Sequence, residues 1–313
     1  MDIFAHILLR NILPLTVMIA IGIVLQRSFS LDIKTLSKLN FYLFSPAIIF
    51  KLLYTTDISF LVIGYVLLFF CIFMVLQYAA AEVVIRLRGI QGGKRAALRN
   101  GVLFYNSANY GIPLNQLAFA GNPQTLAIQV IIMMMQSLIP NTYGIYSVNS
   151  HRSDLRAIRK TILSMPVIYV IPLAFALRGL EVSLPVFIET PVDYLANAFL
   201  GTAIITLGVQ LGSMSWRLSR SLLVDIGLVC LLRLGAGPAL AALVIWALAA
   251  MGMQLPPLMS AALIVSSAVP TSLSSALLAV EFDNEPEFSS QVVFASTMLS
   301  IFSVTLVIWL LQI

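Results

Sequence analysis

Charged residues are scarce in this sequence. Only 10% of the 313 residues are Asp, Glu, Lys or Arg, whereas 60% are hydrophobic. A soluble domain carries about 25% charged residues. The composition therefore excludes a separate soluble domain. It indicates a polytopic membrane protein in which nearly every residue belongs to a span or to a short loop.

Cysteine and histidine are equally rare, with Cys71, Cys230, His6 and His151 as their only representatives. Both cysteines fall inside apolar segments, so we expect small buried hydrophobic residues and no disulfide framework. The sequence also lacks a His-Glu-x-x-His motif, a nucleophile elbow and a phosphate-binding loop. We therefore expect no enzymatic activity, no metal site and no cofactor.

Ten segments are long and apolar enough to be spans, since a span needs about 20 such residues. They are 5–26, 33–52, 61–85, 97–120, 125–147, 160–179, 192–212, 220–250, 257–281 and 288–312. The first is expected to be a span rather than a removed signal peptide, because no charged segment precedes it.

The net charge of +5 comes from the loops and does not indicate a nucleic-acid partner. One set of alternate loops, at 27–38, 86–99, 152–160 and 217–220, holds 14 of the 18 Lys and Arg residues. The positive-inside rule places these loops in the cytoplasm. The prediction is a multi-pass protein of the cell (inner) membrane with both termini outside.

Matching residues recur at a nearly constant offset along the chain. Pro113 and Pro270 are 157 positions apart, Pro14 and Pro172 are 158 apart, and Cys71 and Cys230 are 159 apart. This offset predicts two five-span repeats, 1–147 and 160–313, within one transporter domain, 1–313. Because five is odd, the second repeat enters the membrane inverted, as in many secondary transporters. The short basic loop between them is the expected hinge.

Two predicted spans are interrupted by helix-breaking residues with polar neighbours. The first break lies within 106–120 and the second within 266–272. Proline removes a helix hydrogen bond, and unwound backbone at membrane depth is tolerated only inside protein or beside a wet cavity. A half-helix that restarts there offers free N–H groups and a partial positive charge to an anion. The predicted substrate-binding residues are Asn106, Asn109, Gly111, Pro113, Asn115, Pro270, Thr271 and Ser272.

Other readings of these residues stay open. The prolines can be plain kinks, and the asparagines can bond between helices. Arg233 lies deep in a span and needs a partner, either in a structural pair or in the substrate; Asp225 and the carbonyl ends of the broken helices are candidates. Gln77 and Gln136 either line the cavity or pack. Glu82, near a span end, is expected to be solvated.

Six short motifs resemble the auxin efflux carrier family of membrane transporters. They are Leu36-Ser37-Lys38-Leu39 leading to Ser45-Pro46-Ala47, the Asn-x-x-x-x-Gly-x-Pro pattern at 106–113, Leu207-Gly208-Val209-Gln210-Leu211, Arg233-Leu234 with Pro238, Val269-Pro270-Thr271, and Ala295-Ser296-Thr297-Met298-Leu299-Ser300. Each motif is weak alone, but six in the right order are specific. The long hydrophilic loop of many plant members is absent, so the chain resembles compact bacterial members.

The resemblance implies an all-α fold of ten helices in two inverted repeats, with broken helices four and nine crossing at Pro113 and Pro270. It implies export of a small organic anion, typically a carboxylate, by alternating access, with spans one, two, six and seven as a scaffold and a homodimer as the assembly. A sodium-coupled symporter of the bile-acid type and a transporter-like receptor remain alternatives. The coupling ion stays open.

Overall fold

The computed structural model describes residues 7–56, 59–148, 163–164, 166–214 and 222–313. This part of the chain is helical, and its only β-type pairing is one isolated bridge. The first helical segments are η1 (Leu8–Ile12), α2 (Leu13–Phe29), α3 (Ile33–Leu39), η2 (Asn40–Phe44), α4 (Ser45–Thr55), α5 (Phe60–Leu87), α6 (Gly92–Leu103), α7 (Gly111–Ala118), α8 (Pro123–Ile139), η3 (Pro140–Gly144) and α9 (Ile145–Val148). The later ones are α11 (Val167–Gly179), α12 (Val186–Ser213), α13 (Leu223–Cys230), η4 (Leu231–Ala236), α14 (Gly237–Ala250), α15 (Pro257–Ser267), α16 (Leu273–Glu281) and α17 (Pro286–Leu311).

Six helices within these residues are long and apolar enough to cross a membrane. They are Leu8–Phe29, Ile33–Thr55, Leu61–Leu87, Val186–Ser213, Leu223–Ala250 and Pro286–Leu311. Each overlaps a predicted span. The spans predicted at 97–120 and 257–281 are each interrupted, as expected, and are divided into α6 with α7 and α15 with α16. Part of the span predicted at 160–179, and the hinge loop before it, lie outside the described residues.

Three wide π-helical turns each precede a proline. The segments η1, η2 and η4 end directly before α2, α4 and α14, each of which has proline as its second residue. Proline lacks an amide and clashes with the carbonyl one turn back. A π-turn accommodates one extra residue in the helix and lets the chain continue without a break. These three prolines therefore leave continuous spans, unlike the breaks after α6 and α15.

Helices α2 and α12 pack against each other along their lengths. Gly22 of α2 and Gly208 of α12 face each other so closely that a Cβ on either would clash with the partner's backbone. Small residues let helix backbones approach in this way. In membranes the hydrophobic effect does not drive helices together, so close van der Waals packing drives their association. The two glycines thus join the beginning of the first predicted repeat to that of the second.

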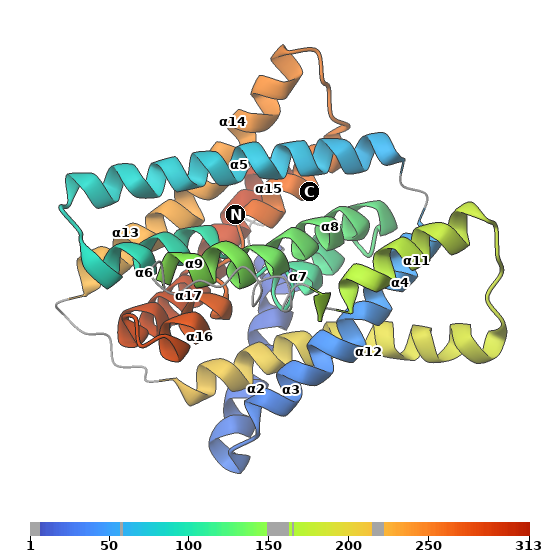
Figure 1. The fold of residues 1–313 in the computed structure, drawn as a ribbon, viewed down its shortest axis with the longest axis horizontal. Helices are drawn as coiled ribbons and strands as arrows, with labels where there is room; N and C mark the ends of the chain where they lie inside the picture. Colours follow the sequence, from blue (N-terminus) through green and yellow to red (C-terminus); the bar gives the residue numbers. More distant parts are fainter. Residues whose placement is uncertain (1–6, 57–58, 149–162, 165, 215–221) are drawn as a thin grey trace.

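The helices form two groups (Figure 1). In the first, α2, α3 and α4 pack against α11 and α12, and in the second, α5, α6 and α8 pack with α13 to α17. The groups meet where α4 lies against α8, and where α7 lies against α12 and η1. Both broken spans belong to the second group. One hollow at the boundary between the groups is the candidate site below.

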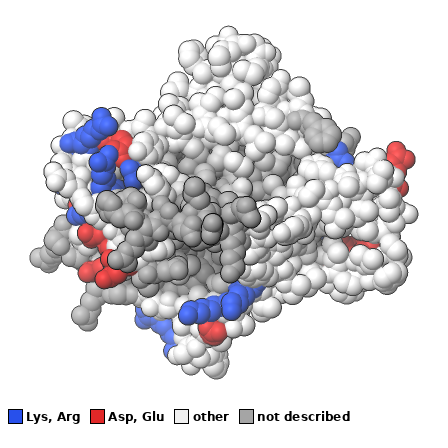
Figure 2. Space-filling model, viewed as in Figure 1, with Lys and Arg blue, Asp and Glu red and all other residues white. Residues whose placement is uncertain are grey.

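The outer surface is largely apolar. In Figure 2 charged side chains gather at the margins, and the upper part of the face, over α14 and the middle of α5, shows none. Large hydrophobic side chains such as Leu61, Val75 and Trp246 are more than 60% exposed, as lipid-facing positions require. Cys71 is also exposed, so the expectation of burial is wrong for it, because it lies on this outer face of α5. Cys230 is buried as expected.

Candidate functional site

The two broken spans pair through their unwound backbones. Tyr105 and Thr271 form an isolated antiparallel bridge. The amide of Asn106 donates to the carbonyl of Pro270 at 2.8 Å, and the amide of Ser272 donates to the carbonyl of Phe104 at 2.7 Å. Backbone groups that lose their helix partners at membrane depth need such replacements. The crossing is therefore a short two-stranded pairing between α6–α7 and α15–α16.

The prolines lie differently at the two breaks. Pro270 is at the crossing and contributes its carbonyl to it. Pro113 is the third residue of α7, whereas the first break begins after Leu103, earlier in the chain. A proline in the first helical turn removes an amide that has no helix partner in any case. The chain thus crosses at Tyr105 rather than at Pro113, which corrects the predicted crossing point.

Asn106 and Ser272 each accept a backbone amide just after the crossing. The side-chain oxygen of Asn106 accepts the amide of Asn109 at 3.1 Å. The hydroxyl of Ser272 accepts the amide of Ser274 at 3.2 Å. Asn and Ser are favoured at this position because they satisfy one of the amides that a helix start leaves open. Helix α16 therefore begins directly after the crossing, whereas α7 begins at Gly111 after a turn that Asn106 stabilises.

Two backbone amides beside these caps stay available as donors. Within the described residues, the N–H groups of Ala108 and Leu273 have no hydrogen-bond acceptor. Both residues line the same pocket. Leu273 is the first residue of α16, and Ala108 lies in the turn that leads into α7. A helix start carries a partial positive charge of about half a unit. Two such ends directed to one space are a ready site for an anion.

The pocket between the two groups of helices has a volume of about 200 Å³, and polar side chains supply much of its lining. One wall comes from the crossing, with Asn106, Ser107, Asn109, Ser272 and Ser274. Leu273 and Leu277 also line a second hollow of about 440 Å³, which reaches the starts of α3 and α17. The site is small and has a larger hollow beside it.

The opposite wall is formed by α3, η2 and α12. Asn40 is 5% exposed and donates to the hydroxyl of Thr206 at 2.7 Å, while its own oxygen accepts the hydroxyl of Thr202 at 2.7 Å. Gln210 donates to the hydroxyl of Ser37 at 3.3 Å. These contacts fix the polar side chains of the wall, so the pocket is shaped before any ligand arrives.

Helix α8 holds the first break in place. The side chain of Gln136 donates to the carbonyl of Leu103 at 3.2 Å and accepts the amide of Tyr105 at 3.4 Å. Gln129 donates to the carbonyl of Ser107 at 2.8 Å. Gln136 also lines the pocket. Buried amide side chains of this kind replace the helix bonds that the unwound stretch has lost.

The structure brings some of the predicted site residues to the pocket and places others elsewhere. Asn106, Asn109, Ser272 and Gln136 line it. Thr271 is fully buried and donates to the carbonyl of Gly101 at 2.7 Å. The others lie away from the lining: Gly111 packs against Gln129, Asn115 accepts the hydroxyl of Thr125 at 2.9 Å, and Pro113 is inside α7.

Arg233 and Gln77 lie behind the crossing and do not line the pocket. Arg233 is fully buried and donates to the carbonyls of Val102 and Ser267, near the ends of α6 and α15. Asp225 instead pairs with Lys94 at 2.5 Å. Within the described residues, neither polar atom of Gln77 has a hydrogen-bond partner. The carbonyl ends of the broken helices are thus the partners of Arg233.

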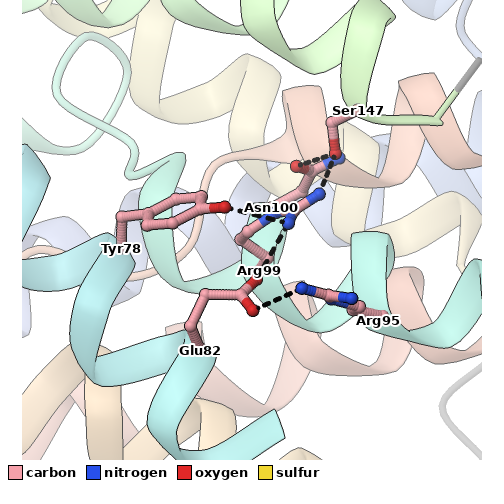
Figure 3. A network of polar contacts seen from close by, with 6 residues as sticks. All are labelled: Tyr78, Glu82, Arg95, Arg99, Asn100 and Ser147. Carbon is pink, nitrogen blue, oxygen red and sulfur yellow. Dashed lines mark hydrogen bonds and ion pairs between the residues drawn. The ribbon is translucent and has the colours of Figure 1, made fainter. Parts of the chain in front are cut away.

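A separate polar network lies at the far ends of α5 and α6 (Figure 3). The carboxylate of Glu82 accepts hydrogen bonds from Arg95 at 2.7 Å and from Arg99 at 2.8 Å. The hydrogen bond from Arg95 to Glu82 raises the pKa of Arg95. Arg99 also reaches Ser147 at 3.3 Å and lies over the ring of Tyr78. Glu82 is buried, so the prediction that it is solvated is wrong, because α6 brings two arginines beside it.

Other places in the described residues offer less for a polar ligand. A groove of about 770 Å³ lies between α13–α14 and α17, but its lining is almost wholly apolar. No group of three His, Cys, Asp or Glu residues in the described part of the chain could hold a metal ion. The pocket at the crossing is the place where donors, polar side chains and space coincide.

The sequence profile described as "Membrane transport protein" matches residues 7–308. The chain belongs to the membrane transport protein family. As a member of this family it is a multi-pass membrane transporter, and the resemblance to the auxin efflux carriers is confirmed. The family consists of transporters and not of enzymes.

One curated relative extends over nearly the same length. An uncharacterized transporter of Methanothermobacter thermautotrophicus is 26% identical over 305 residues, which cover 95% of this chain and 96% of that protein. The similarity agrees with the family assignment along the whole chain. The relative's name specifies no substrate.

Sequence reasoning missed the wall opposite the crossing in this family member. Ser37, Asn40, Ser45 and Gln210 line the pocket, yet none belongs to a broken span. A signal was present, because Asn40 and Gln210 are uncharged polar residues inside predicted spans 33–52 and 192–212. Without the packing of α3 against α12, nothing in the sequence directs them toward the crossing.

Proposed function

We propose that this transporter is a secondary carrier of a small organic anion, such as a carboxylate, and that it exports its substrate across the cell membrane by alternating access. One observation carries the proposal: Ala108 and Leu273, whose amides have no hydrogen-bond acceptor within the described residues, line the same polar pocket next to the crossing. A carboxylate can accept from both amides, and the helix dipoles favour its charge.

The size and lining of the pocket support a small substrate. Pockets for drug-sized ligands have volumes of about 300–1,000 Å³, and this one has about 200 Å³. None of its lining residues is Asp or Glu, which favours an anion over a cation. A sodium-coupled symporter of the bile-acid type would want carboxylates among the ligands of the ion, and this lining has none.

We further propose that residues 1–147 and 160–313 form two inverted repeats. The division of both spans into α6 with α7 and α15 with α16 supports this relation, as does the 157-residue offset between Pro113 and Pro270. In this scheme α2, α3, α4, α11 and α12 are the scaffold, through which two copies form a homodimer. The second group of helices moves as a unit and carries the crossing with it.

Transport into proteoliposomes tests the proposal. The purified protein would be tested with radiolabelled acetate, lactate, benzoate, phenylacetate and indole-3-acetate under imposed pH, sodium and voltage gradients. We expect saturable flux of at least one carboxylate and none with empty liposomes. Absence of flux for every acid, from a protein that is folded and correctly inserted, would contradict an organic-anion carrier.

Capping variants connect the flux to the pocket. Asn106→Ala and Ser272→Ala each remove one hydrogen bond that fixes a half-helix start, which is worth about 0.5–1.5 kcal/mol. We expect the half-saturation concentration to rise by about twofold to tenfold. Asn115→Ala changes an asparagine of the same span outside the pocket and is the matched control. An equal effect in all three variants would show that the pocket is not the substrate-binding site.

A further inference from the structure

Arg233 is a fully buried cation at the centre of the molecule. Its guanidinium donates to the carbonyl of Val102 at 3.1 Å and to the carbonyl of Ser267. It also lies over two aromatic rings, with 4.5 Å to the ring centre of Tyr105 and 5.8 Å to that of Phe73. The guanidinium group stays protonated in proteins. A permanent positive charge is therefore fixed behind the crossing.

No carboxylate neutralises this charge in the described part of the chain. Asp225 pairs with Lys94 and Arg88, Glu82 pairs with two arginines of α6, and Asp193 pairs with Lys51. A buried charge normally has an ionic partner or coordinates a metal. The partners of Arg233 are instead neutral carbonyls and aromatic rings. Its positive charge is therefore not offset by an ionic partner in the described part of the chain.

Four helix ends near the crossing carry partial charges of their own, two negative and two positive. Helices α6 and α15 end there, and each C-terminal end carries about half a negative unit. Helix α16 begins there at Leu273, and α7 begins at Gly111 after the turn that follows the crossing, each with about half a positive unit. Arg233 bonds the last carbonyls of α6 and α15. It therefore offsets their negative ends and leaves the two positive ends uncompensated.

Tyr105 connects the two sides of the crossing. Its ring packs on the Arg233 guanidinium, and the same residue lines the pocket. Arg233 itself does not reach the lining. The fixed charge thus lies one aromatic ring away from the space where the substrate would bind, in surroundings where charges interact more strongly than in water.

Building on the proposed carrier function, we propose that Arg233 is the fixed countercharge of the transported anion. It positions the two broken helices and supplies their net positive charge without touching the substrate. A substrate with one negative charge then neutralises the interior of the moving unit. The site selects monoanions over dianions and over neutral analogues.

This arrangement determines which step of the cycle responds to voltage. The loaded unit carries the charges of Arg233 and the substrate, which sum to zero, so it crosses the membrane electroneutrally. The empty unit carries the positive charge of Arg233 alone. A membrane potential therefore acts on the return of the empty carrier. The cycle as a whole still moves one negative charge with each monoanion.

Voltage jumps in the absence of substrate test the proposal. The full-length protein would be placed in planar bilayers in Hepes buffer without carboxylates, and the transient current after each jump would be integrated. The wild type should show a saturating transient charge. Arg233→Met should lose it, and Arg233→Lys should keep it. A folded Arg233→Met protein with the wild-type transient would overturn the proposal, as would a wild type without any transient.

Arg178→Met is the matched control. Arg178 also donates to helix-end carbonyls, with 2.6 Å to that of Thr56, but it belongs to the proposed scaffold, so the transient charge should persist. A loss equal to that of Arg233→Met would overturn the assignment. A merely structural role for Arg233 would lower stability without removing a voltage-dependent charge from protein that stays folded.

A charge exchange covers the case in which Arg233→Met does not fold. Gln77 Nε2 and Arg233 Nη2 lie 3.3 and 2.9 Å from the place that a Cβ of Gly237 would occupy, so the two side chains are neighbours. Arg233→Gln combined with Gln77→Arg should keep the transient charge, and its loss from a folded double variant would overturn the proposal. Flux of the labelled acids is measured separately, so failure of carboxylate transport and failure of the countercharge are distinguishable.

Discussion

Glu82 shows how single residues carry charge in this apolar protein. Only 8% of its side chain is exposed, and its two oxygens accept from Arg95 and Arg99. Lys51 and Asp193 form the opposite case, with 32% and 42% of their side chains exposed. An exposed pair contributes about 0–1 kcal/mol, whereas breaking a buried pair costs about 3–5 kcal/mol. The burial of an ion pair therefore determines how much its loss changes the free energy of unfolding.

Neutralising the two carboxylates should separate these cases. Glu82→Gln leaves Arg99 buried without its counterion, and we expect a loss of about 3 kcal/mol, the low end of the range for buried pairs because Arg95 is half exposed. Asp193→Asn should change stability by less than about 1 kcal/mol. The measurement is reversible unfolding in detergent, and similar losses for both variants would contradict the role of burial.

At the scale of elements, close helix packing depends on glycine. Gly22 and Gly208 allow α2 and α12 to touch backbone to backbone, whereas a Cβ at Gly64 of α5 would meet no atom within 4 Å. The three glycines have the same chemistry, and only their neighbours differ. Replacing each glycine by alanine therefore compares the cost of a steric clash between helices with the gain from the higher helix propensity of alanine.

Gly208→Ala should destabilise the protein, because the new methyl group forces α2 and α12 apart; overpacking of this kind costs about 1–3 kcal/mol. Gly64→Ala should be neutral or stabilising by up to about 1 kcal/mol, since alanine is the better helix former. Thermal unfolding of the two variants and the wild type provides the comparison. Gly208→Ala with wild-type stability would rule out the close approach of α2 and α12.

The sequence predicts the elements well and the contacts between them poorly. Apolar length alone locates the six long apolar helices among the ten predicted spans, and Pro270 identifies the second break. Pro113 misplaces the first, because a proline in a first helical turn does not unwind the chain. The local pattern cannot show that Gln136 replaces the lost helix bonds of Leu103 and Tyr105, since that depends on how α8 packs.

At the scale of the whole molecule, the pocket lies where the two groups of helices meet. Ser37 lines it from the first group and Leu277 from the second. Alternating access requires the groups to move relative to each other. A bond across the boundary should therefore block transport, while a bond inside one group should not.

Ser37→Cys with Leu277→Cys, in a background lacking Cys71 and Cys230, would be joined by a bifunctional thiol reagent. We expect loss of flux with unchanged unfolding temperature. Met18→Cys with Gly201→Cys is the control, because these positions lie 3.8 Å apart between the Met18 side chain and a Gly201 Cβ within the first group. Full flux in the protein joined across the boundary would refute relative motion of the groups.

The π-helical turns η1, η2 and η4 affect how the sequences of related proteins can diverge. A π-turn is an α-helix with one residue inserted, so a helix can gain or lose that residue without losing its ends. In an ordinary helix a single deletion turns everything beyond it by about 100°. Arg233 lies inside η4. Related proteins aligned through this span should therefore tolerate a one-residue gap here, and such a gap would decide whether a basic side chain at this point can face the crossing at all.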